Sequence, residues 1–451
     1  MIPASTIYTG QHFAILGMGA SGVPAARLAM RLGARVTVLD SGSGDKTEAC
    51  AAGLRSEGFT CFTGTTALCA GHEFDLAVFS PGIDPSWPLA RLMLDHGVPA
   101  ISEVEFAIRN TVIPYIAITG TNGKTTTTEL IAAMLNAGGR RTVPCGNHGL
   151  AVSEIVLRNE PWDLLTIEMS SFQLELIEAF RPLVAVWRNF APDQLDRHPS
   201  LDAYRAAKQR IFENQREGDT AVLNGAETYP TLAARRTYFS AYHEGFDFSF
   251  QNGCIMHGAE VLIPLRETGL RGLHNAENIM AAAAAAMAIG VPLSAIHAAL
   301  ISYSPPPHRC QLAGTVRGRE FINDSKATNI HAMESALRGM PARVILIAGG
   351  KDKHLDYSTA TELVREKTTA VFTIGEISEA LATVWGKASA CRACGTLDIA
   401  VKAALEAAQP GQTILFAPGT SSFDQFTGYD HRGRVFTELV HKLSIATDQQ
   451  H

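Results

Sequence analysis

The 451-residue sequence is poor in charged residues, in aromatic residues and in long apolar runs. Only 18% of its residues are charged and the net charge is −6, so it lacks the basic surplus of a nucleic-acid-binding surface. No apolar run approaches the roughly 20 residues that a membrane-spanning helix needs, and the first residues lack the basic segment of a signal peptide. We therefore expect no nucleic-acid partner, no membrane insertion and a cytoplasmic location.

Cysteine is also sparse, with eight residues scattered through the chain. Cys391 and Cys394 have the CxxC spacing, but no second pair accompanies them. This distribution favours free thiols in a reducing compartment over a disulfide framework, a zinc site or a redox site.

The length of the chain predicts about three domains, at roughly 150 residues each. Three stretches repeat the order apolar strand, glycine turn and helix, which predicts α/β domains with mainly parallel sheets. We place these domains at residues 1–102, 103–306 and 307–451. The prolines at 305–307 forbid a helix and stiffen the connection to the third domain.

The first glycine pattern lies near the N-terminus. Gly17, Gly19 and Gly22 form G-x-G-x-x-G between a predicted strand and a predicted helix, and Asp40 ends the next predicted strand. Such a turn lets a diphosphate approach the N-terminus of the helix. From the residues alone, NAD and another diphosphate ligand are equally good candidates, and an unliganded tight turn is the alternative.

A second glycine loop lies in "AITGTNGKTTTTEL", residues 117–130. The loop is shorter than a Walker A loop, because Ile118 stands where the first glycine of that motif would be. Its backbone N–H groups would still face an anion, Lys124 would reach β- and γ-phosphates, and Thr125 offers a hydroxyl to Mg²⁺. The alternative is a glycine turn followed by a lysine with no such role.

Other polar residues follow predicted strands, where ligands of parallel sheets bind. Glu168 either holds Mg²⁺ or caps the helix predicted to begin near Ser170. Lys208 lies on a predicted amphipathic helix, and the residues alone give it no function. The charges after the predicted strands of the third domain either line a ligand site or are solvated, and they are Asp324, Lys326, Lys351, Asp352 and Lys353.

Seven short motifs then occur in order over nearly the whole chain. They are "GTNGKTT", "EMSSFQLE", "LHNAEN", "PHR", "NDSKATN", "GGKDK" and "SSFDQF". Together they resemble the Mur ligase family, the ATP-dependent amide ligases of bacterial peptidoglycan synthesis. The resemblance implies a Rossmann-like N-terminal domain for the UDP end of a substrate, a central P-loop-type ATPase domain with a mainly parallel sheet, and a Rossmann-like C-terminal domain for an incoming amino acid.

The resemblance also implies a reaction. The γ-phosphoryl group of ATP passes to the alanyl carboxylate of UDP-N-acetylmuramoyl-L-alanine, and the amine of glutamate then displaces phosphate from the acyl phosphate. ATP is the co-substrate, Mg²⁺ is the cofactor, and we expect a monomer. The motifs leave D- and L-glutamate open, since both present the same two carboxylates.

The family's site residues are implied only where the motifs match. ATP contacts fall on Gly120, Thr121, Asn122, Gly123, Lys124, Thr125, Thr126, Asn278, Arg309 and Asp324. UDP-substrate contacts fall on Gly19, Ala20, Ser21, Asp40, Ser41, Gly82 and Asn147. Glutamate contacts fall on Lys326, Thr328, Lys353, Ser422 and Phe423. The implied catalytic residues are Lys124, Glu168 and Lys208, with Lys208 as a carbamate (N6-carboxylysine), and the implied metal ligands are Thr125, Glu168, Lys208 and Gln194.

One position departs from the family pattern. Gln194 stands where the family usually has a metal-binding histidine in D-H-x-D. An amide oxygen can still ligate Mg²⁺. His198 follows one helical turn later and would substitute only if the loop is rearranged.

Three alternatives remain beside the amide ligase. The first is a related ligase that adds L-glutamate or another amino acid, or that extends folylpolyglutamate, although "DSKATN" and "SSFDQF" disfavour folate. The second is a regulatory or motor ATPase without a small-molecule acceptor, and the third is an NAD-dependent oxidoreductase, which leaves Lys124 unexplained. For the ligase, we expect the third domain to swing inward and exclude water from the acyl phosphate.

Overall fold

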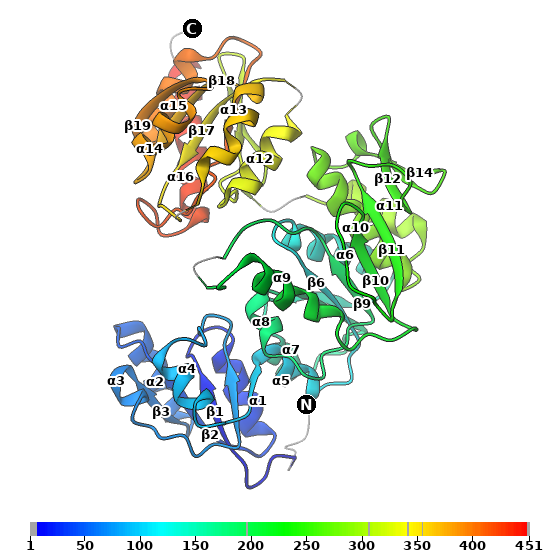
Figure 1. The fold of residues 1–451 in the computed structure, drawn as a ribbon, viewed down its shortest axis with the longest axis vertical. Helices are drawn as coiled ribbons and strands as arrows, with labels where there is room; N and C mark the ends of the chain where they lie inside the picture. Colours follow the sequence, from blue (N-terminus) through cyan, green and yellow to red (C-terminus); the bar gives the residue numbers. More distant parts are fainter. Residues whose placement is uncertain (1–6, 195–196, 305–306, 341, 354, 449–451) are drawn as a thin grey trace.

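The computed structural model describes residues 7–194, 197–304, 307–340, 342–353 and 355–448. Three α/β lobes lie along the long axis of the molecule, each built on its own sheet (Figure 1). The chain runs from the N-terminal lobe through the central lobe to the C-terminal lobe. The predicted fold class is therefore confirmed.

The N-terminal lobe has a five-stranded sheet in the order β3-β2-β1-β4-β5, and all of its strand pairs are parallel. This is the arrangement expected when each apolar strand is followed by a helix that crosses over the sheet. The strands are β1 (His12–Leu16), β2 (Arg35–Asp40), β3 (Thr60–Thr63), β4 (Leu76–Phe79) and β5 (Ala100–Ser102). The helices are α1 (Gly22–Arg31), α2 (Asp45–Ser56), α3 (Gly64–Ala67), α4 (Pro88–Leu94) and α5 (Glu103–Arg109).

The central lobe has a nine-stranded sheet in the order β14-β13-β12-β11-β10-β9-β6-β8-β7. It is parallel except at β12–β13 and β13–β14, two short hairpins at one edge. The strands are β6 (Tyr115–Thr119), β7 (Thr142–Gly146), β8 (Leu164–Glu168), β9 (Val184–Trp187), β10 (Thr220–Asn224), β11 (Arg235–Ser240), β12 (Phe248–Gln251), β13 (Cys254–His257) and β14 (Glu260–Pro264). The helices are α6 (Lys124–Ala137), α7 (Val152–Arg158), α8 (Ser171–Glu175), α9 (Leu201–Gln209), α10 (Leu273–Ala288) and α11 (Leu293–Ser302), with 3-10 turns at Arg210–Phe212 and Leu265–Glu267.

The C-terminal lobe has a six-stranded sheet in the order β15-β16-β20-β17-β18-β19, parallel except at β15–β16. The strands are β15 (Gln311–Val316), β16 (Arg319–Asn323), β17 (Val344–Gly349), β18 (Thr368–Ile374), β19 (Ala390–Gly395) and β20 (Thr413–Phe416). The helices are α12 (Ile330–Gly339), α13 (Thr361–Lys367), α14 (Ser378–Trp385), α15 (Leu397–Ala407) and α16 (Tyr429–Asp448), with a 3-10 turn at Tyr357–Ala360.

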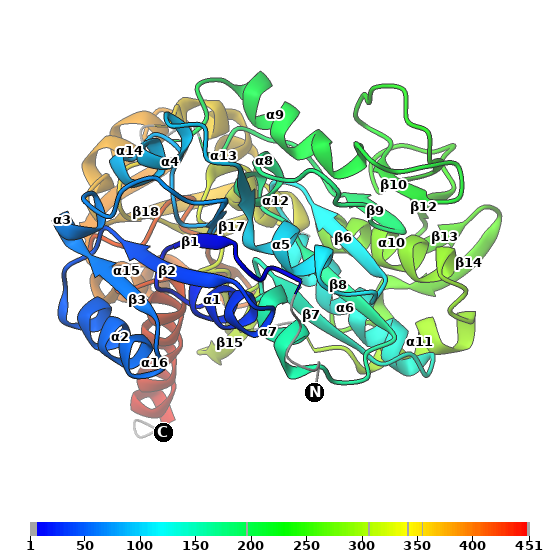
Figure 2. The same ribbon diagram turned by 90° about the horizontal axis from the view of Figure 1, so that it is seen from below.

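The hydrophobic core does not divide evenly among the lobes. One cluster runs from β1 and α1 through α5 and α7 into β8, β9 and β10, so the N-terminal and central lobes share it. Figure 2 shows α1, α5 and α7 side by side between these two lobes. The C-terminal lobe has two clusters of its own, which draw on no residue before Cys310. The central and C-terminal lobes are therefore the pair with the weaker apolar connection.

The sequence-based domain boundaries remain predictions. The predicted boundary between residues 102 and 103 falls where β5 ends and α5 begins, and α5 packs on both neighbouring lobes. At the second boundary, Pro305 and Pro306 lie outside the described residues.

Two further expectations concern composition. All eight cysteines are free, and Cys391 and Cys394 are half-buried on the edge strand β19. Within the described part of the chain, no helix has both the length and the apolar character that crossing a bilayer requires.

Candidate active site

The phosphate-type loop joins β6 to α6 as predicted from the sequence. Gly123 precedes the first residue of α6 and has φ +83°, and a Cβ there would lie 2.3 Å from the side-chain oxygen of Asn278. Lys124 folds back over the loop, with its Nζ donating to the carbonyl oxygens of Gly120 and Thr121 at 3.0 Å each. The loop therefore presents a lysine and a helix N-terminus together, the combination that binds polyphosphates.

Glu168 ends β8, which pairs with β6, so its carboxylate lies beside the loop. Its side chain is buried, and Oε1 accepts a hydrogen bond of 2.8 Å from Nδ2 of Asn147. Oε2 is also buried and has no hydrogen-bond partner among the described residues. A buried carboxylate oxygen without a donor is costly, and a cation would satisfy it.

The donor set around Glu168 fits Mg²⁺. The hydroxyl of Thr125 and the carboxylate of Glu168 line the same cavity, together with Gln194. No cluster of three or more His, Cys, Asp or Glu side chains suited to a metal occurs among the described residues. A sparse protein set suits Mg²⁺, which keeps several waters and binds substrate phosphates.

Lys208 lies on α9 behind the loop. Its side chain is 1% exposed, and Nζ donates to the carbonyl oxygen of Gly120 at 2.8 Å. Burial, and next the charge of Lys124, lower the pKa of Lys208 well below its usual value. This lysine, for which the residues alone gave no function, is therefore a buried amine that touches the phosphate loop.

Two side chains, Gln194 and His198, are candidates for the role of the metal-binding histidine that the family usually has in D-H-x-D. Gln194 has φ +58° and lines the cavity beside the loop. The Nε2 of His198 lies 2.9 Å from the hydroxyl of Ser171, and its Nδ1 lies 3.4 Å from Glu175. His198 therefore packs on α8, whereas Gln194 occupies the place beside the metal candidates.

The loop opens into a first cavity of about 290 Å³ between the central and C-terminal lobes. Most of the residues implied to bind ATP line it, although Gly120 contributes through the lysine contacts described above. These lining residues are Thr121, Asn122, Gly123, Lys124, Thr125, Thr126, Asn278, Arg309 and Asp324.

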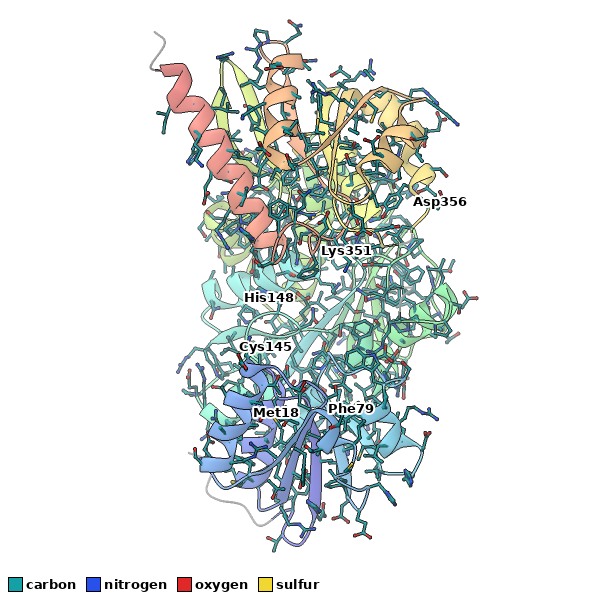
Figure 3. The ribbon with its side chains drawn as sticks, turned by 90° about the vertical axis from the view of Figure 1, so that its left-hand side faces the viewer. Met18, Phe79, Cys145, His148, Lys351 and Asp356 are labelled. Carbon is teal, nitrogen blue, oxygen red and sulfur yellow. The ribbon has the colours of Figure 1, made fainter. Side chains whose placement is uncertain are left out.

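A second cavity of about 730 Å³ continues toward α16. His148, Tyr429 and Arg434 contribute to its lining. Figure 3 shows His148 in the central lobe, between Met18 of the N-terminal lobe and Lys351 of the C-terminal lobe. The residues that line both the first and the second cavity are Thr125, Asn147, Glu168, Arg309 and Lys326.

Some of the residues implied to bind glutamate line the two cavities, and others lie outside the lining. Lys326 lines both cavities and Thr328 lines the first, whereas Ser422 is buried outside the lining. Lys353 lies 3.6 Å from the carboxylate of Asp193. Burial, and next the charge of Arg309, lower the pKa of Lys326 to about 8.

Two aromatic residues, Phe423 and Tyr429, differ in their relation to the cavities. Phe423 is 67% exposed and does not belong to the lining of either cavity. Tyr429 lines the second cavity instead, and the Nζ of Lys326 lies 3.7 Å from its ring centroid. The side chain of Tyr429 is thus the aromatic group in contact with the implied glutamate-binding lysine.

A third cavity of about 520 Å³ lies at the glycine turn of the N-terminal lobe. Gly19, Ala20 and Asp40 line it as the motif implies, and Lys46 is a cation that the sequence did not single out. Asp40 accepts a hydrogen bond of 2.7 Å from the backbone N–H of Met18, which fixes the turn. Among the implied UDP-substrate contacts, those outside the lining of this cavity are Ser21, Ser41, Gly82 and Asn147.

Several polar contacts at or beside the first cavity were not expected from the sequence. Asn329 donates to Asp193 at 3.2 Å, and the side chains of Asn122 and His331 lie 2.8 Å apart, so both pairs link the central lobe to the C-terminal lobe. Arg188, 1% exposed, also lines the cavity. Asn122 and Asn329 lie within the motifs, but the motifs do not indicate these contacts, since the partners are distant in sequence.

Comparisons with known proteins agree with this geometry. Residues 118–286 match the Mur ligase middle domain, and residues 308–420 match the Mur ligase glutamate ligase domain. A UDP-N-acetylmuramoylalanine--D-glutamate ligase of Acidobacterium capsulatum is 39% identical over 445 residues, which cover 96% of this chain and 96% of that relative. The chain belongs to the Mur ligase family. A UDP-N-acetylmuramoylalanine--D-glutamate ligase of Koribacter versatilis is 38% identical, and the match covers 96% of this chain and 98% of that relative.

Solved structures support the fold of this Mur ligase. A pseudomurein peptide ligase type C from Methanothermus fervidus covers 96% of this chain and all of its own, with a TM-score of 0.59 and 17% identity. The UDP-N-acetylmuramate-alanine ligase MurC from Thermotoga maritima covers 96% of this chain and 99% of its own, with a TM-score of 0.58 and 16% identity. At these identities the likeness concerns the fold.

Proposed function

We propose that this Mur ligase joins D-glutamate to the L-alanyl carboxylate of UDP-N-acetylmuramoyl-L-alanine at the expense of ATP, in the cytoplasm and as a monomer. The observation that carries the proposal is the meeting of two cavities at one set of shared residues beside the phosphate loop. The names of the full-length relatives support the choice of D-glutamate and of the UDP-linked substrate.

Each lobe then holds one part of the reaction. The first cavity takes the nucleotide, with its phosphates at Lys124 and the N-terminus of α6. The third cavity takes the UDP end of the sugar substrate, and Lys46 provides a positive charge toward its diphosphate. The alanyl end reaches the shared residues, where Asn147 and Glu168 lie next to Thr125.

In the first step, an oxygen of the alanyl carboxylate attacks the γ-phosphorus of ATP, and the bond between that phosphorus and the bridging oxygen of ADP breaks. The products are an acyl phosphate and ADP. Two anions must approach each other, and the ammonium of Lys124 offsets their charge. When bound, Mg²⁺ would supply further charge neutralisation, with Thr125, Glu168 and Gln194 as its protein ligands.

In the second step, the amine of glutamate attacks the acyl carbon, and inorganic phosphate leaves as the amide forms. The neutral amine loses one proton during this step, and the departing phosphate takes it up and leaves as hydrogen phosphate. Lys326 and Lys353 are the cations for the two carboxylates of glutamate, and Tyr429 covers one side of the pocket against Lys326. Exclusion of water is needed here because water would hydrolyse the acyl phosphate.

Lys208 belongs to the same proposal as a carbamate. Its neutral amine attacks the carbon of CO₂, a C–N bond forms, and one proton is released. The burial that lowers the pKa of Lys208 favours the neutral amine that this reaction requires. The nitrogen retains one N–H, which can continue to donate to Gly120, and the new carboxylate adds a negative charge beside the metal candidates.

Closure of the C-terminal lobe completes the proposed cycle. The separate cores of that lobe and the polar contacts across the junction allow it to move against the other two lobes. We expect a change in the solution scattering profile when saturating substrates bind, and an unchanged profile would contradict closure.

Phosphate release tests the whole proposal. The enzyme is supplied with Mg·ATP, UDP-N-acetylmuramoyl-L-alanine and either enantiomer of glutamate, and each component is omitted in turn. We expect release to require all three substrates, to be faster with D-glutamate, and to yield one new amide by mass spectrometry. Release that is indifferent to glutamate, without a new amide, would refute ligation.

A further inference from the structure

Arg188 is a buried cation with an unusual environment. It follows β9, its side chain is 1% exposed, and it lines the first cavity. The nearest paired carboxylate is that of Glu277, 4.0 Å away, at the outer limit of an ion pair. The Nη1 of Arg188 is buried and has no hydrogen-bond partner among the residues described.

Such a charge is costly to the fold. Burial lowers the pKa of Arg188 to about 10, which still leaves the side chain charged at neutral pH. Replacing a whole buried ion pair by apolar residues is often neutral or stabilising, so a buried pair is weak evidence of a purely stabilising role. The position of Arg188 on the cavity gives a reason to look for a functional role as well.

The contacts of Arg188 indicate that role. Its Nε and Nη2 both donate to Oδ1 of Asn278, at 3.0 and 2.7 Å. Because arginine only donates, the oxygen of this amide must face Arg188. The Nδ2 of Asn278 then faces Asn275, to whose Oδ1 it donates at 2.9 Å.

A third neighbour of the amide, Thr127, cannot set this orientation. The hydroxyl of Thr127 lies 3.3 Å from Oδ1 of Asn278, but a hydroxyl can either donate or accept. Asn275 favours the same orientation, because its own N–H₂ donates to the carbonyl oxygen of Arg271 at 2.8 Å, which leaves its oxygen to accept from Asn278. Arg188 supplies the two charged donors on the oxygen side of the Asn278 amide, so without Arg188 the orientation depends on Asn275 alone.

The pair also supports the phosphate loop. A Cβ on Gly120 would lie 2.8 Å from Cβ of Arg188, and a Cβ on Gly123 would lie 3.3 Å from its Nε. Arg188 and Asn278 thus lie directly against the two glycines of the loop. The amide that Arg188 orients is next to the place where the nucleotide's phosphates and base are held.

We propose that Arg188 is a positioning residue for the nucleotide: its forked contact with Asn278 fixes that amide with the N–H₂ as the donor available to ATP. This inference rests on the proposed ATP site. A buried side chain behind the loop thus helps to determine which group of Asn278 meets the ligand.

A double-mutant cycle tests the inference through direct binding. Isothermal titration with Mg²⁺ and a non-hydrolysable ATP analogue is carried out on the full chain and on the variants Arg188→Met, Asn278→Ala and the double variant. We expect each single variant to weaken binding by about tenfold, the loss of one charge-assisted or oriented hydrogen bond. The double variant should bind no more weakly than Asn278→Ala, because Arg188 acts through Asn278.

The controls separate orientation from charge and from folding. Arg188→Lys keeps the charge but loses the paired donation from Nε and Nη2 to Asn278, so it should weaken binding as Arg188→Met does. Arg158→Met removes an exposed arginine of the same lobe, paired with Glu154 at 2.9 Å, and should leave binding unchanged. The melting temperature of Arg188→Met should fall, because this variant leaves Glu277 buried without its cation, so binding is measured well below the transition; if this variant fails to melt cooperatively, Arg188→Lys completes the cycle.

The outcomes are distinct. Losses that multiply in the double variant, or normal binding by Arg188→Met and Arg188→Lys, would overturn the inference while leaving glutamate ligation untouched. A protein that shows the expected coupling but makes no amide would refute the proposed ligation and leave the role of Arg188 standing.

Discussion

The carboxylate of Asp193 and the ammonium of Lys353 lie 3.6 Å apart, across the junction between the central and C-terminal lobes. Lys353 is also one of the two cations proposed to bind glutamate. Since the Lys353 side chain is 31% exposed, its pairing with Asp193 contributes little, about 1 kcal/mol or less. Glutamate can therefore displace Asp193 from Lys353 at small cost.

Substitution of Lys353 should act on glutamate alone. We expect Lys353→Ala to raise the glutamate KM by about tenfold or more, since a hydrogen bond to a charged group is lost, and to leave the KM for ATP nearly unchanged. Initial rates at varied glutamate and at varied ATP separate the two effects. Lys402→Ala, at an exposed lysine of the same lobe, is the control; an equal rise of both KM values would argue against the assignment.

Substitution of Lys124 should act on phosphoryl transfer. Lys124→Ala removes the ammonium that offsets the charge of two anions, so kcat should fall by about 100-fold or more. Binding of UDP-N-acetylmuramoyl-L-alanine, measured by calorimetry, should be nearly intact, because the third cavity lies in another lobe. Retained turnover would remove the loop from the mechanism.

Glu168→Gln tests the metal site with little change of shape. The variant keeps an oxygen for the hydrogen bond from Asn147 but loses the charge at the unpaired Oε2. We expect about tenfold or more Mg²⁺ to be needed for half-maximal phosphate release. Glu129→Gln is a suitable control, because both oxygens of Glu129 already have partners in His148 and Tyr303. An unchanged Mg²⁺ requirement in Glu168→Gln would exclude it as a ligand.

Chemical rescue tests the carbamate on Lys208. Lys208→Ala should lose activity and regain part of it with acetate or formate, because a small carboxylate can occupy the space of the missing group. Lys208→Arg places a long basic side chain at this position that cannot be carbamylated in the same way, so it should stay inactive. Full activity of Lys208→Ala without added acid would exclude the carbamate.

The pKa of Lys326 predicts a pH dependence. A lysine is charged below its pKa, and burial lowers that of Lys326 to about 8, so its attraction for carboxylates should be present at neutral pH and decline as the pH rises through 8. Glutarate, which has both carboxylates but no amine to titrate, should bind up to about tenfold more weakly at about pH 9 than at about pH 7. Lys326→Arg should bind glutarate with little pH dependence, and an equally pH-dependent Arg variant would place the titration elsewhere.

The sequence predicted the parts of the site that are local in the chain. The phosphate loop, Lys124 and Glu168 are each specified within a few residues by a strand, a turn and a helix, and the structure brings them together. The parallel order of the sheets also follows from repeated strand–turn–helix units. The two hairpins of β12–β14 at the edge of the central sheet did not show in that pattern.

The parts of the site that the sequence did not predict depend on contacts between segments that are distant in the chain. Arg188 and Asn278 are 90 positions apart, and nothing near Arg188 in the sequence indicates the amide that it orients. Phe423 lies within the motif "SSFDQF" but is exposed, whereas Tyr429 meets Lys326 because α16 begins at that residue and faces the cavity. Proximity of this kind is set by how lobes and helices pack.

The apolar cluster that the first two lobes share, and the third lobe does not, also bears on engineering. Cutting the chain between the central and C-terminal lobes would expose little apolar surface, because these lobes share no hydrophobic cluster among the residues that the structure describes. Cutting before α5 would instead divide the hydrophobic cluster that the N-terminal and central lobes share. A graft of the last lobe from a ligase with another amino-acid preference is therefore a practical route to altered products, and an isolated N-terminal fragment is a poor candidate for expression.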